Sequence, residues 1–347
     1  MNKFTKRVLS VVMALAMVLS VLSVSAFAAT SKTVKSYNEY TSLGDSIAAG
    51  FSMPEYNAKR GSYYCIEPQR IKDSYPDLIA KATKVKTMNA YASPGYRTNE
   101  VRYLLDNNYN GDFVTQKWVA TLSHLDSNTI ENMNKRRPLY QNAIKNSDLV
   151  TLDIGLNDTW LPVMGAIMEI IYQGDPQKNI EAMQKDATQG IDNGYTLEDF
   201  MSDAQIVINS PKYLPKLIQA FYTIATLSDY TENYKAIVDR IFELNPDTTL
   251  CQISNYNPFK DFPEEWGKTL ASLAQSILYD KMNNVKLECS QKYGSKCKYI
   301  DVNNLPPVRC NTGAMLLQQG ANWDPHPTEA GHKYIADQVF KALPARS

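Results

Sequence analysis

The segment EYTSLGDSIAAGF, residues 39–51, places a serine at the point where an apolar run gives way to small residues. Ser46 follows a glycine and an aspartate, so we expect it on a turn between a strand and a helix. A serine hydroxyl in that position can act as a nucleophile if a base lies within hydrogen-bond reach. It can equally cap the helix, which is the commoner role of an isolated Gly-Asp-Ser. The partners offered by the rest of the chain must decide between these roles.

The chain contains three histidines, and one of them occupies a place suited to a base. His124 lies outside the loops that follow predicted strands, and His332 falls within the final predicted helix. His326, in NWDPHPTEAGH, comes after the last predicted strand and before that helix. A lone histidine there more often packs or caps, but its coincidence with three other polar loops favours a general base for Ser46.

Two further loops offer hydrogen-bond donors for a developing oxyanion. Gly95, in YASPGYRTNE, has no Cβ to shield its backbone N–H. Asn157, in GLNDTW, follows an apolar run and can aim its side-chain amide into a cleft. Each of these residues taken alone would be an ordinary turn residue. Asp45 and Asp158 stand next to the candidate residues, and we expect both to fix their loops by accepting backbone N–H groups.

Five short apolar or β-branched segments are predicted to be strands, and helical stretches separate them. These segments are residues 40–43, 85–90, 149–154, 249–254 and 299–302. The alternating order predicts one three-layer α/β/α domain, residues 29–347, with a parallel sheet. Such sheets bind ligands beyond the carboxyl ends of their strands. The four candidate loops all follow predicted strands, the last of them at some distance.

A long segment from residue 160 to about residue 246 separates the third and fourth predicted strands. Its apolar spacing suits helices packed on the domain, and part of it could form a cap over the site. The residues that follow Asn157 could line a groove for an acyl chain, although burial in the core explains them at least equally well. They are Met164, Ile167, Met168, Ile170 and Ile171.

Ser46 in GDS, Gly95 in the second loop, Asn157 in GLND and His326 in DPHPT together resemble the four blocks of the SGNH hydrolases, the GDSL-type lipases and esterases. The resemblance spans nearly the whole chain after residue 28. It implies a flavodoxin-like sheet of five parallel strands in the order 2-1-3-4-5. It also implies an oxyanion hole made by the Ser46 N–H, the Gly95 N–H and the Asn157 amide.

The last block departs from the family pattern, in which an aspartate stands three residues before the histidine. Trp323 occupies that place, and the acid is Asp324, two residues before His326. Both Asp324 and His326 precede prolines, which favours an extended chain whose residues two apart face the same side. We therefore expect Asp324 to orient His326 as the triad acid. In the alternative, the Trp323 carbonyl does so and Asp324 caps a helix starting near Thr328.

The first 28 residues are typical of a secretory signal peptide, with basic residues, an apolar run and a small-x-small cleavage site, although a membrane anchor is the alternative. Without them the chain has 33 Lys and Arg against 36 Asp and Glu. We therefore expect no nucleic-acid partner and no membrane insertion after cleavage. Export permits disulfides. Cys289 and Cys297 are the expected pair, while Cys251, in an apolar strand, is expected to be a buried free thiol.

The sequence therefore predicts a secreted, extracellular serine esterase or lipase that acts on small-molecule or polymer-borne esters through an acyl-enzyme. We expect no cofactor and no metal, because the chain has no Walker loop and no set of residues with metal-ligand spacing. A carbohydrate acetylesterase of the same fold is an open alternative, since one scaffold hosts both activities. A glycan- or surface-binding protein without catalysis is the second alternative.

Overall fold

The computed structural model describes residues 34–56, 69–111, 130–159, 211–213, 215–216, 218–219, 227–260, 265–308 and 325–345. Contacts divide the chain into a terminal unit, Met1–Lys35 with Leu343–Ser347, and a main unit, Ser36–Ala342. In the terminal unit, Val34 and Ala345 form an isolated antiparallel bridge. The main unit contains the helices, strands and site described below. The predicted signal segment, residues 1–28, lies outside the described residues.

Five strands of the main unit form one parallel sheet in the order β2-β1-β3-β4-β5. These strands are β1 (Glu39–Gly44), β2 (Thr87–Ala92), β3 (Leu149–Asp153), β4 (Thr249–Ile253) and β5 (Cys297–Ile300). β3 is buried along its whole length, and β1 is buried after its first residue. Such burial is typical of parallel strands that are covered on both faces. The predicted parallel sheet and the implied strand order are confirmed.

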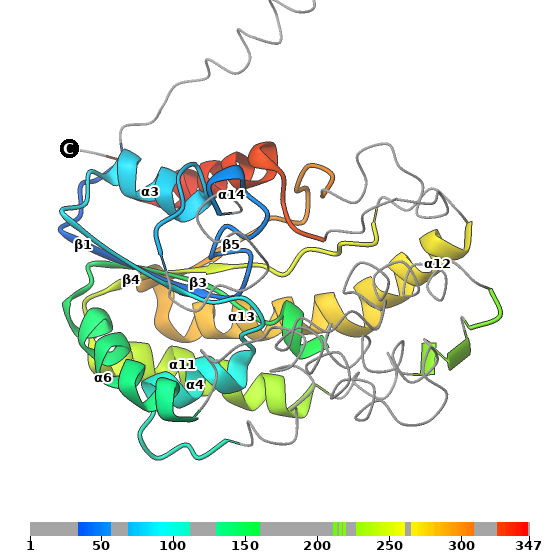
Figure 1. The fold of residues 1–347 in the computed structure, drawn as a ribbon, viewed down its shortest axis with the longest axis horizontal. Coiled ribbons are helices and arrows are strands. Elements are labelled where there is room, and N and C mark those ends of the chain that lie inside the picture. Colours follow the sequence, from blue (N-terminus) through cyan, green and yellow to red (C-terminus); the bar gives the residue numbers. More distant parts are fainter. Residues whose placement is uncertain are drawn as a thin grey trace, which may run out of the picture. The chain divides into compact units, whose positions relative to one another are not determined.

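Helices cover both faces of this sheet, which gives the three predicted layers (Figure 1). On one face α3 (Tyr75–Thr83) packs against α14 (Glu329–Ala342). The other face carries α4 (Thr98–Leu105), α6 (Ile130–Asn146), α11 (Ser228–Leu244) and α13 (Asp280–Tyr293). α12 (Glu265–Ala274) leads into α13 through one π-helical turn, η2 (Gln275–Tyr279).

β2 starts later than predicted because Lys84 and Val85 close the end of the preceding helix. Pro76 lies in the first turn of α3, where a missing N–H costs no helical hydrogen bond. Lys84 then takes a left-handed conformation with a φ of 53° and ends the helix, its N–H bonded to carbonyls of the last turn. β2 consequently begins at Thr87 instead of residue 85, and it extends to Ala92.

The fifth strand is shifted in the opposite direction, toward the N-terminus, relative to the predicted residues 299–302. β5 begins at Cys297, which pairs with Leu250 of β4, and it ends at Ile300. Beyond that point the N–H of Val302 donates to the Ser254 hydroxyl at 2.8 Å, so a side chain replaces the strand ladder there.

The expected disulfide between Cys289 and Cys297 is wrong, because both residues are free thiols. The residues between them form the last turn of α13 and the 3-10 turn η3 (Gly294–Lys296). The Cys297 Sγ instead accepts a hydrogen bond from the Gln252 side chain at 3.0 Å. Cys251 is a buried free thiol as predicted.

The long segment between β3 and β4 contributes α11, which contacts α4 and α13. Its buried face includes Tyr234, Ile237 and Ile241. For this part of the segment, helices packed on the domain are confirmed. The apolar residues considered for an acyl groove, Met164, Ile167, Met168, Ile170 and Ile171, lie outside the described residues.

Candidate active site

β1 ends at Gly44, where the main chain of β3 passes too close for any side chain. A Cβ on Gly44 would collide with the carbonyl oxygen of Asp153. The next residue, Asp45, donates its N–H to that carbonyl at 3.1 Å and accepts the Ile47 N–H on its carboxylate at 2.9 Å. Asp45 thereby caps the turn and fixes the loop as predicted, which leaves the Ser46 hydroxyl for another partner.

His326 is the partner of the Ser46 hydroxyl. Its Nε2 lies 2.8 Å from the Ser46 Oγ, across 280 residues of sequence, and both side chains are partly exposed. The Phe51 ring packs on the imidazole, with the ring centroids 4.6 Å apart. The Tyr256 hydroxyl donates to the Pro325 carbonyl at 2.7 Å and so holds the chain directly before the histidine. In this geometry the imidazole can take the hydroxyl proton as the serine attacks.

The sheet brings the loops after β1, β2 and β3 to one edge. Gly44, the last residue of β1, is paired with Ala92 of β2 on one side and with Asp153 of β3 on the other. The Ser93 N–H then donates to the Gly44 carbonyl at 3.1 Å as β2 ends. Because all three strands end in register, the loops that carry the candidate serine, glycine and asparagine start side by side.

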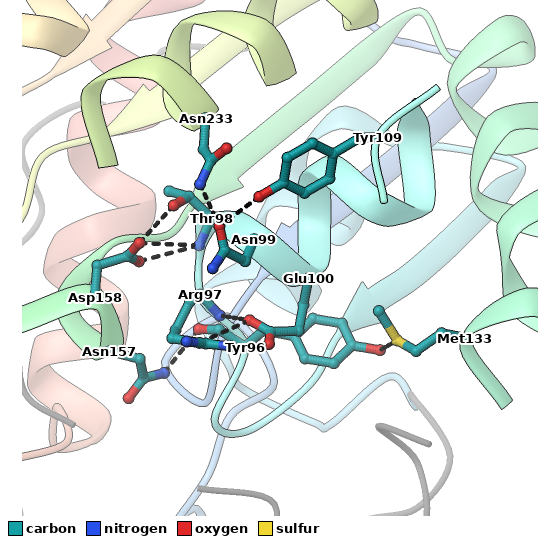
Figure 2. A network of polar contacts seen from close by, with 10 residues as sticks. All are labelled: Tyr96, Arg97, Thr98, Asn99, Glu100, Tyr109, Met133, Asn157, Asp158 and Asn233. Atoms are coloured by element: carbon teal, nitrogen blue, oxygen red, sulfur yellow. Dashed lines mark hydrogen bonds and ion pairs between the residues drawn. The ribbon is translucent and has the colours of Figure 1, made fainter. Parts of the chain in front are cut away.

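The two loops predicted to supply oxyanion donors meet at Asn157 (Figure 2). The Asn157 Nδ2 donates to the carbonyl of Tyr96 at 2.9 Å, and Tyr96 follows Gly95 directly. Gly95 has a φ of 78°, a conformation that glycine adopts without strain. Since Nδ2 carries two hydrogens, one is left for another acceptor. Among the hydrogen bonds between described residues, none uses the N–H of Ser46 or Gly95.

Asp158 ties the third loop to the start of α4. Its Oδ2 accepts the Thr98 N–H at 3.0 Å, and its Oδ1 accepts the Thr98 hydroxyl. Asn157 and Asp158 therefore bind the chain at Tyr96 and Thr98, on either side of Arg97. Burial raises the pKa of Asp158 to about 6, with the hydrogen bonds from Thr98 acting in the opposite direction. The predicted loop-fixing role of this carboxylate is confirmed.

Arg97 forms a buried ion pair with Glu100 at the start of the same helix (Figure 2). The Glu100 carboxylate also accepts the backbone N–H of Arg97 at 2.8 Å, the reciprocal contact of a capping box. Both side chains are about 5% exposed. Sequence reasoning missed this pair, because the usual signal for such a cap is a Ser, Thr, Asp or Asn three positions before the glutamate, and Arg97 stands in that place.

Two buried carboxylates, Asp45 and Asp153, flank the nucleophile turn, and the buried Lys286 interacts with both. Burial raises the pKa of Asp153 to about 6 and that of Asp45 well above its usual range, while burial lowers the pKa of Lys286 to about 8. Sequence reasoning missed Lys286 as well. Its place on α13, one turn after Met282 and one before Cys289, on a buried face, was the available signal.

Asp324, the predicted triad acid, lies outside the described residues, as do His124 and the Trp323 carbonyl. The Thr328 Oγ1 accepts the Gly331 N–H at 3.2 Å, so α14 has its own N-cap and needs none from Asp324. The third histidine, His332, is fully buried in α14, where its ring stacks on Tyr75.

In the described part of the chain, no group of three or more His, Cys, Asp and Glu side chains could hold a metal ion. None of the helices in that part is long and apolar enough to cross a membrane.

The fold and the site together define the class of protein. A parallel sheet in the order 2-1-3-4-5, with a serine after its first strand bonded to a histidine before its last helix, is the arrangement of an SGNH hydrolase. The sequence model of the GDSL-like Lipase/Acylhydrolase family matches residues 42–334. The chain therefore belongs to this family, and membership implies ester hydrolase activity.

Solved structures of lipolytic enzymes have similar folds. A phospholipase A1 from Streptomyces albidoflavus NA297 is 16% identical with a TM-score of 0.52, covering 89% of this chain and 100% of its own. An extracellular lipase from Streptomyces rimosus is 16% identical with a TM-score of 0.49, covering 88% of this chain and 100% of its own. At this identity the first likeness shows the fold alone. No curated protein sequence gives a significant match.

Proposed function

We propose that this protein is a secreted serine esterase or lipase that hydrolyses carboxylic acyl esters through an acyl-enzyme on Ser46. The observation that carries the proposal is the 2.8 Å contact between the Ser46 Oγ and the His326 Nε2. If Ser46 only capped a helix and His326 only packed against its neighbours, a hydrogen bond between the two side chains would not be expected. Asp45 already caps the turn, so the serine hydroxyl is not needed for that purpose.

In the acylation step the Ser46 oxygen attacks the ester carbonyl carbon while the His326 Nε2 takes the hydroxyl proton. The carbonyl oxygen becomes an oxyanion, which the N–H groups of Ser46 and Gly95 and the second Nδ2 hydrogen of Asn157 stabilise. The carbon–oxygen bond to the alcohol then breaks. His326 returns its proton to the departing alkoxide, so the alcohol leaves neutral and the acyl group stays on the serine.

Deacylation repeats these steps with water as the nucleophile. His326 takes a proton from the water as the water oxygen attacks the acyl carbonyl, and the same donors stabilise the second oxyanion. When the bond to the Ser46 oxygen breaks, the histidine gives the proton to that oxygen. A carboxylic acid leaves, and the enzyme returns to its starting state without a cofactor.

Acyl esters are the proposed substrates for two reasons. The partly exposed Phe51 ring lies against His326, so the base has an apolar neighbour on the exposed side of the site. The sequence after Asn157 also supplies a run of apolar residues from Met164 to Ile171, in a part of the chain that the structure does not describe. We expect an apolar side chain beside the base, together with an apolar segment that reaches the site, to favour acyl chains over hydrated sugars.

A panel of esters from acetyl to palmitoyl, together with acetylated xylan, tests the function on purified protein lacking residues 1–28. We expect kcat/KM to be maintained or to rise from acetyl to octanoyl esters. A steady fall over this range, with release of acetate from the xylan, would replace the proposal by a carbohydrate acetylesterase. Hydrolysis of none of these esters would favour the non-catalytic binding protein.

Variants in the same assay connect the activity to the site. Ser46→Ala and His326→Ala should each lower kcat by at least about 10³-fold with an unchanged Tm, because each removes a member of one coupled unit. Ser276→Ala, at an exposed serine of η2, is the matched control and should keep full activity. Activity within tenfold of the wild type in either site variant would contradict the assignment.

Secretion is part of the proposal and rests on the N-terminal sequence, with its basic start, apolar run and cleavage site ending at Ala28. The N-terminus of protein recovered from the culture medium of an expressing host measures this directly. We expect Ala29 as the first residue. Retention of the full chain in the cell membrane would support the anchor instead.

A further inference from the structure

Lys286 is fully buried on α13, and its ammonium group uses all three of its donors. Its Nζ donates to the Ile253 carbonyl at 2.6 Å, to the Asn255 Oδ1 at 3.0 Å and to the Ile154 carbonyl at 3.2 Å. Burying an ammonium group is costly unless it is hydrogen-bonded and its charge is compensated. A buried lysine in this position therefore indicates a role for its ammonium group in addition to packing.

The two carbonyls lie where β3 and β4 end. Ile154 follows Asp153, the last residue of β3, and Ile253 is the last residue of β4. At this point the sheet ladder stops, so the carbonyls need other donors. The Lys286 ammonium supplies them and joins the ends of two adjacent strands. The Ile154 carbonyl directly precedes Gly155, and Asn157 lies two residues further on, in the helical turn 156–159.

The same face of α13 also holds the chain after β4, which packs against Gly155. Asn283, one turn before Lys286, accepts the Asn255 N–H at 2.8 Å and donates to the Asn255 carbonyl at 3.0 Å. A Cβ added to Gly155 would lie 2.8 Å from the Met282 side chain and 2.9 Å from the Asn255 side chain. Gly155, which begins the segment that carries Asn157, is therefore closely packed against side chains of α11 and α13.

Charge compensation comes from the nucleophile side. Asp153 and Asp45 both attract the Lys286 ammonium, and Asp45 directly precedes Ser46. Lys286 thus interacts electrostatically with Asp45, next to the nucleophile, and it hydrogen-bonds to the Ile154 carbonyl at the end of β3, shortly before Asn157. Its three acceptors fix its position without any contact with solvent.

We propose that Lys286 is a positioning residue, whose ammonium holds the Ile154 carbonyl and thereby fixes the segment 155–157 from which Asn157 reaches the oxyanion. Lys286 does not touch the substrate. The inference rests on the proposed function, because it assigns the effect to the oxyanion hole of that reaction. A donor that is fixed in place stabilises the transition state without having to move during the reaction. If the segment that carries Asn157 becomes mobile, kcat should fall while KM stays nearly the same.

The first test compares Lys286→Met with Lys292→Met in steady-state ester hydrolysis. Methionine keeps most of the apolar length of lysine and removes the donors. We expect Lys286→Met to lower kcat by about 10- to 100-fold with KM within about threefold of the wild type. Lys292, exposed on the same helix and paired with Asp239, should tolerate the change. An unchanged kcat in Lys286→Met would overturn the inference.

A second variant separates positioning from charge compensation. Lys286→Met leaves Asp153 without its counter-charge and can lower stability for that reason alone. In Lys286→Met combined with Asp153→Asn, the positive charge of Lys286 and the negative charge of Asp153 are both removed, so Tm should return toward the wild-type value. We expect kcat to stay low, because the Ile154 carbonyl still lacks its donor. Recovery of kcat together with Tm would overturn the inference and leave Lys286 a compensating charge only.

Hydrogen exchange provides a readout that does not depend on activity. Backbone amides of residues 154–159 should exchange at least about tenfold faster in the double variant than in the wild type, while those of α6 stay unchanged. If the wild type hydrolysed no ester, the proposed function would fail and this measurement would still test the role of Lys286. Equal exchange in the loop would overturn it.

Discussion

The Asn157 amide has two hydrogens and, among the described residues, one acceptor. One hydrogen bonds to the Tyr96 carbonyl, which fixes the plane of the amide, and the other remains for a ligand. The side chain is about 9% exposed, so it is largely shielded from water. A donor that is held in place and shielded stabilises a developing charge more strongly than water does.

Replacing Asn157 by alanine should therefore lower kcat by about 10²- to 10³-fold with little change in KM, because an oxyanion donor acts in the transition state. Steady-state kinetics on a short-chain ester measures both parameters. A rise in KM with kcat unchanged would instead make Asn157 a residue of substrate binding.

The orientation of His326 depends on an acceptor for its second ring nitrogen, and we propose Asp324 for this role. The Thr328 hydroxyl already caps α14, so the carboxylate is not needed there. Asp324→Asn should lower kcat by about 10³-fold or more, on the general precedent of triad acids. A loss below tenfold with an unchanged Tm would point to a Ser46–His326 dyad completed by a backbone carbonyl.

At the scale of elements, the start of α4 links the donor loops. Asn157 and Asp158 hold the chain at Tyr96 and Thr98, directly after Gly95. Because α4 packs against α6 and α11, its N-terminus is also held in place by these two helices. The position of the Gly95 N–H is thus set by a helix and by the third loop together.

Asp158→Ala removes both acceptors for Thr98 and should lower kcat by about tenfold with KM unchanged, in addition to a loss of about 1 kcal/mol of stability from the missing cap. Asp280→Ala, at the start of α13 away from these loops, is the control for a general loss of stability. Equal kinetic effects of the two changes would contradict a positioning role for Asp158.

The sequence predicts those features of the strands and the site whose signals lie in short stretches of the chain. Ser46 and His326 each follow a predicted strand, and the rule for parallel sheets brings them to one edge. The start of β2 was less predictable, because Lys84, a residue type that seldom takes a left-handed conformation, does so at the end of α3. The role of Lys286 was not predicted, because a lysine is expected at the surface. Its acceptors, the carbonyls of Ile154 and Ile253, come together only when β3 and β4 are paired in the folded chain.

At the scale of the whole molecule, buried carboxylates make stability depend on pH. Burial raises the pKa of Asp158 to about 6 from an ordinary value near 3.8. Between about pH 4 and pH 6 the folded chain therefore keeps a proton that the unfolded chain has lost. The contribution of Asp158 to the free energy of unfolding is full below about pH 4 and falls as pH rises to about 6.

Asp158→Asn removes this titration and keeps an oxygen that accepts the Thr98 N–H. The free energy of unfolding of the variant minus that of the wild type should therefore increase from pH 4 to pH 7. Urea unfolding of both proteins at four pH values across this range measures it. A difference that is constant, or that decreases with pH, would contradict the raised pKa.

The central claim is that Ser46 is a nucleophile activated by His326, and covalent labelling tests it most directly. A fluorophosphonate forms a bond to an activated serine oxygen with loss of fluoride. Mass spectrometry of the labelled protein should show one adduct per chain, on the peptide that contains Ser46. Ser46→Ala should take up no label, and His326→Ala should react at least about 10²-fold more slowly. A wild-type protein that stays unlabelled, or that carries its adduct on another residue, would contradict the account.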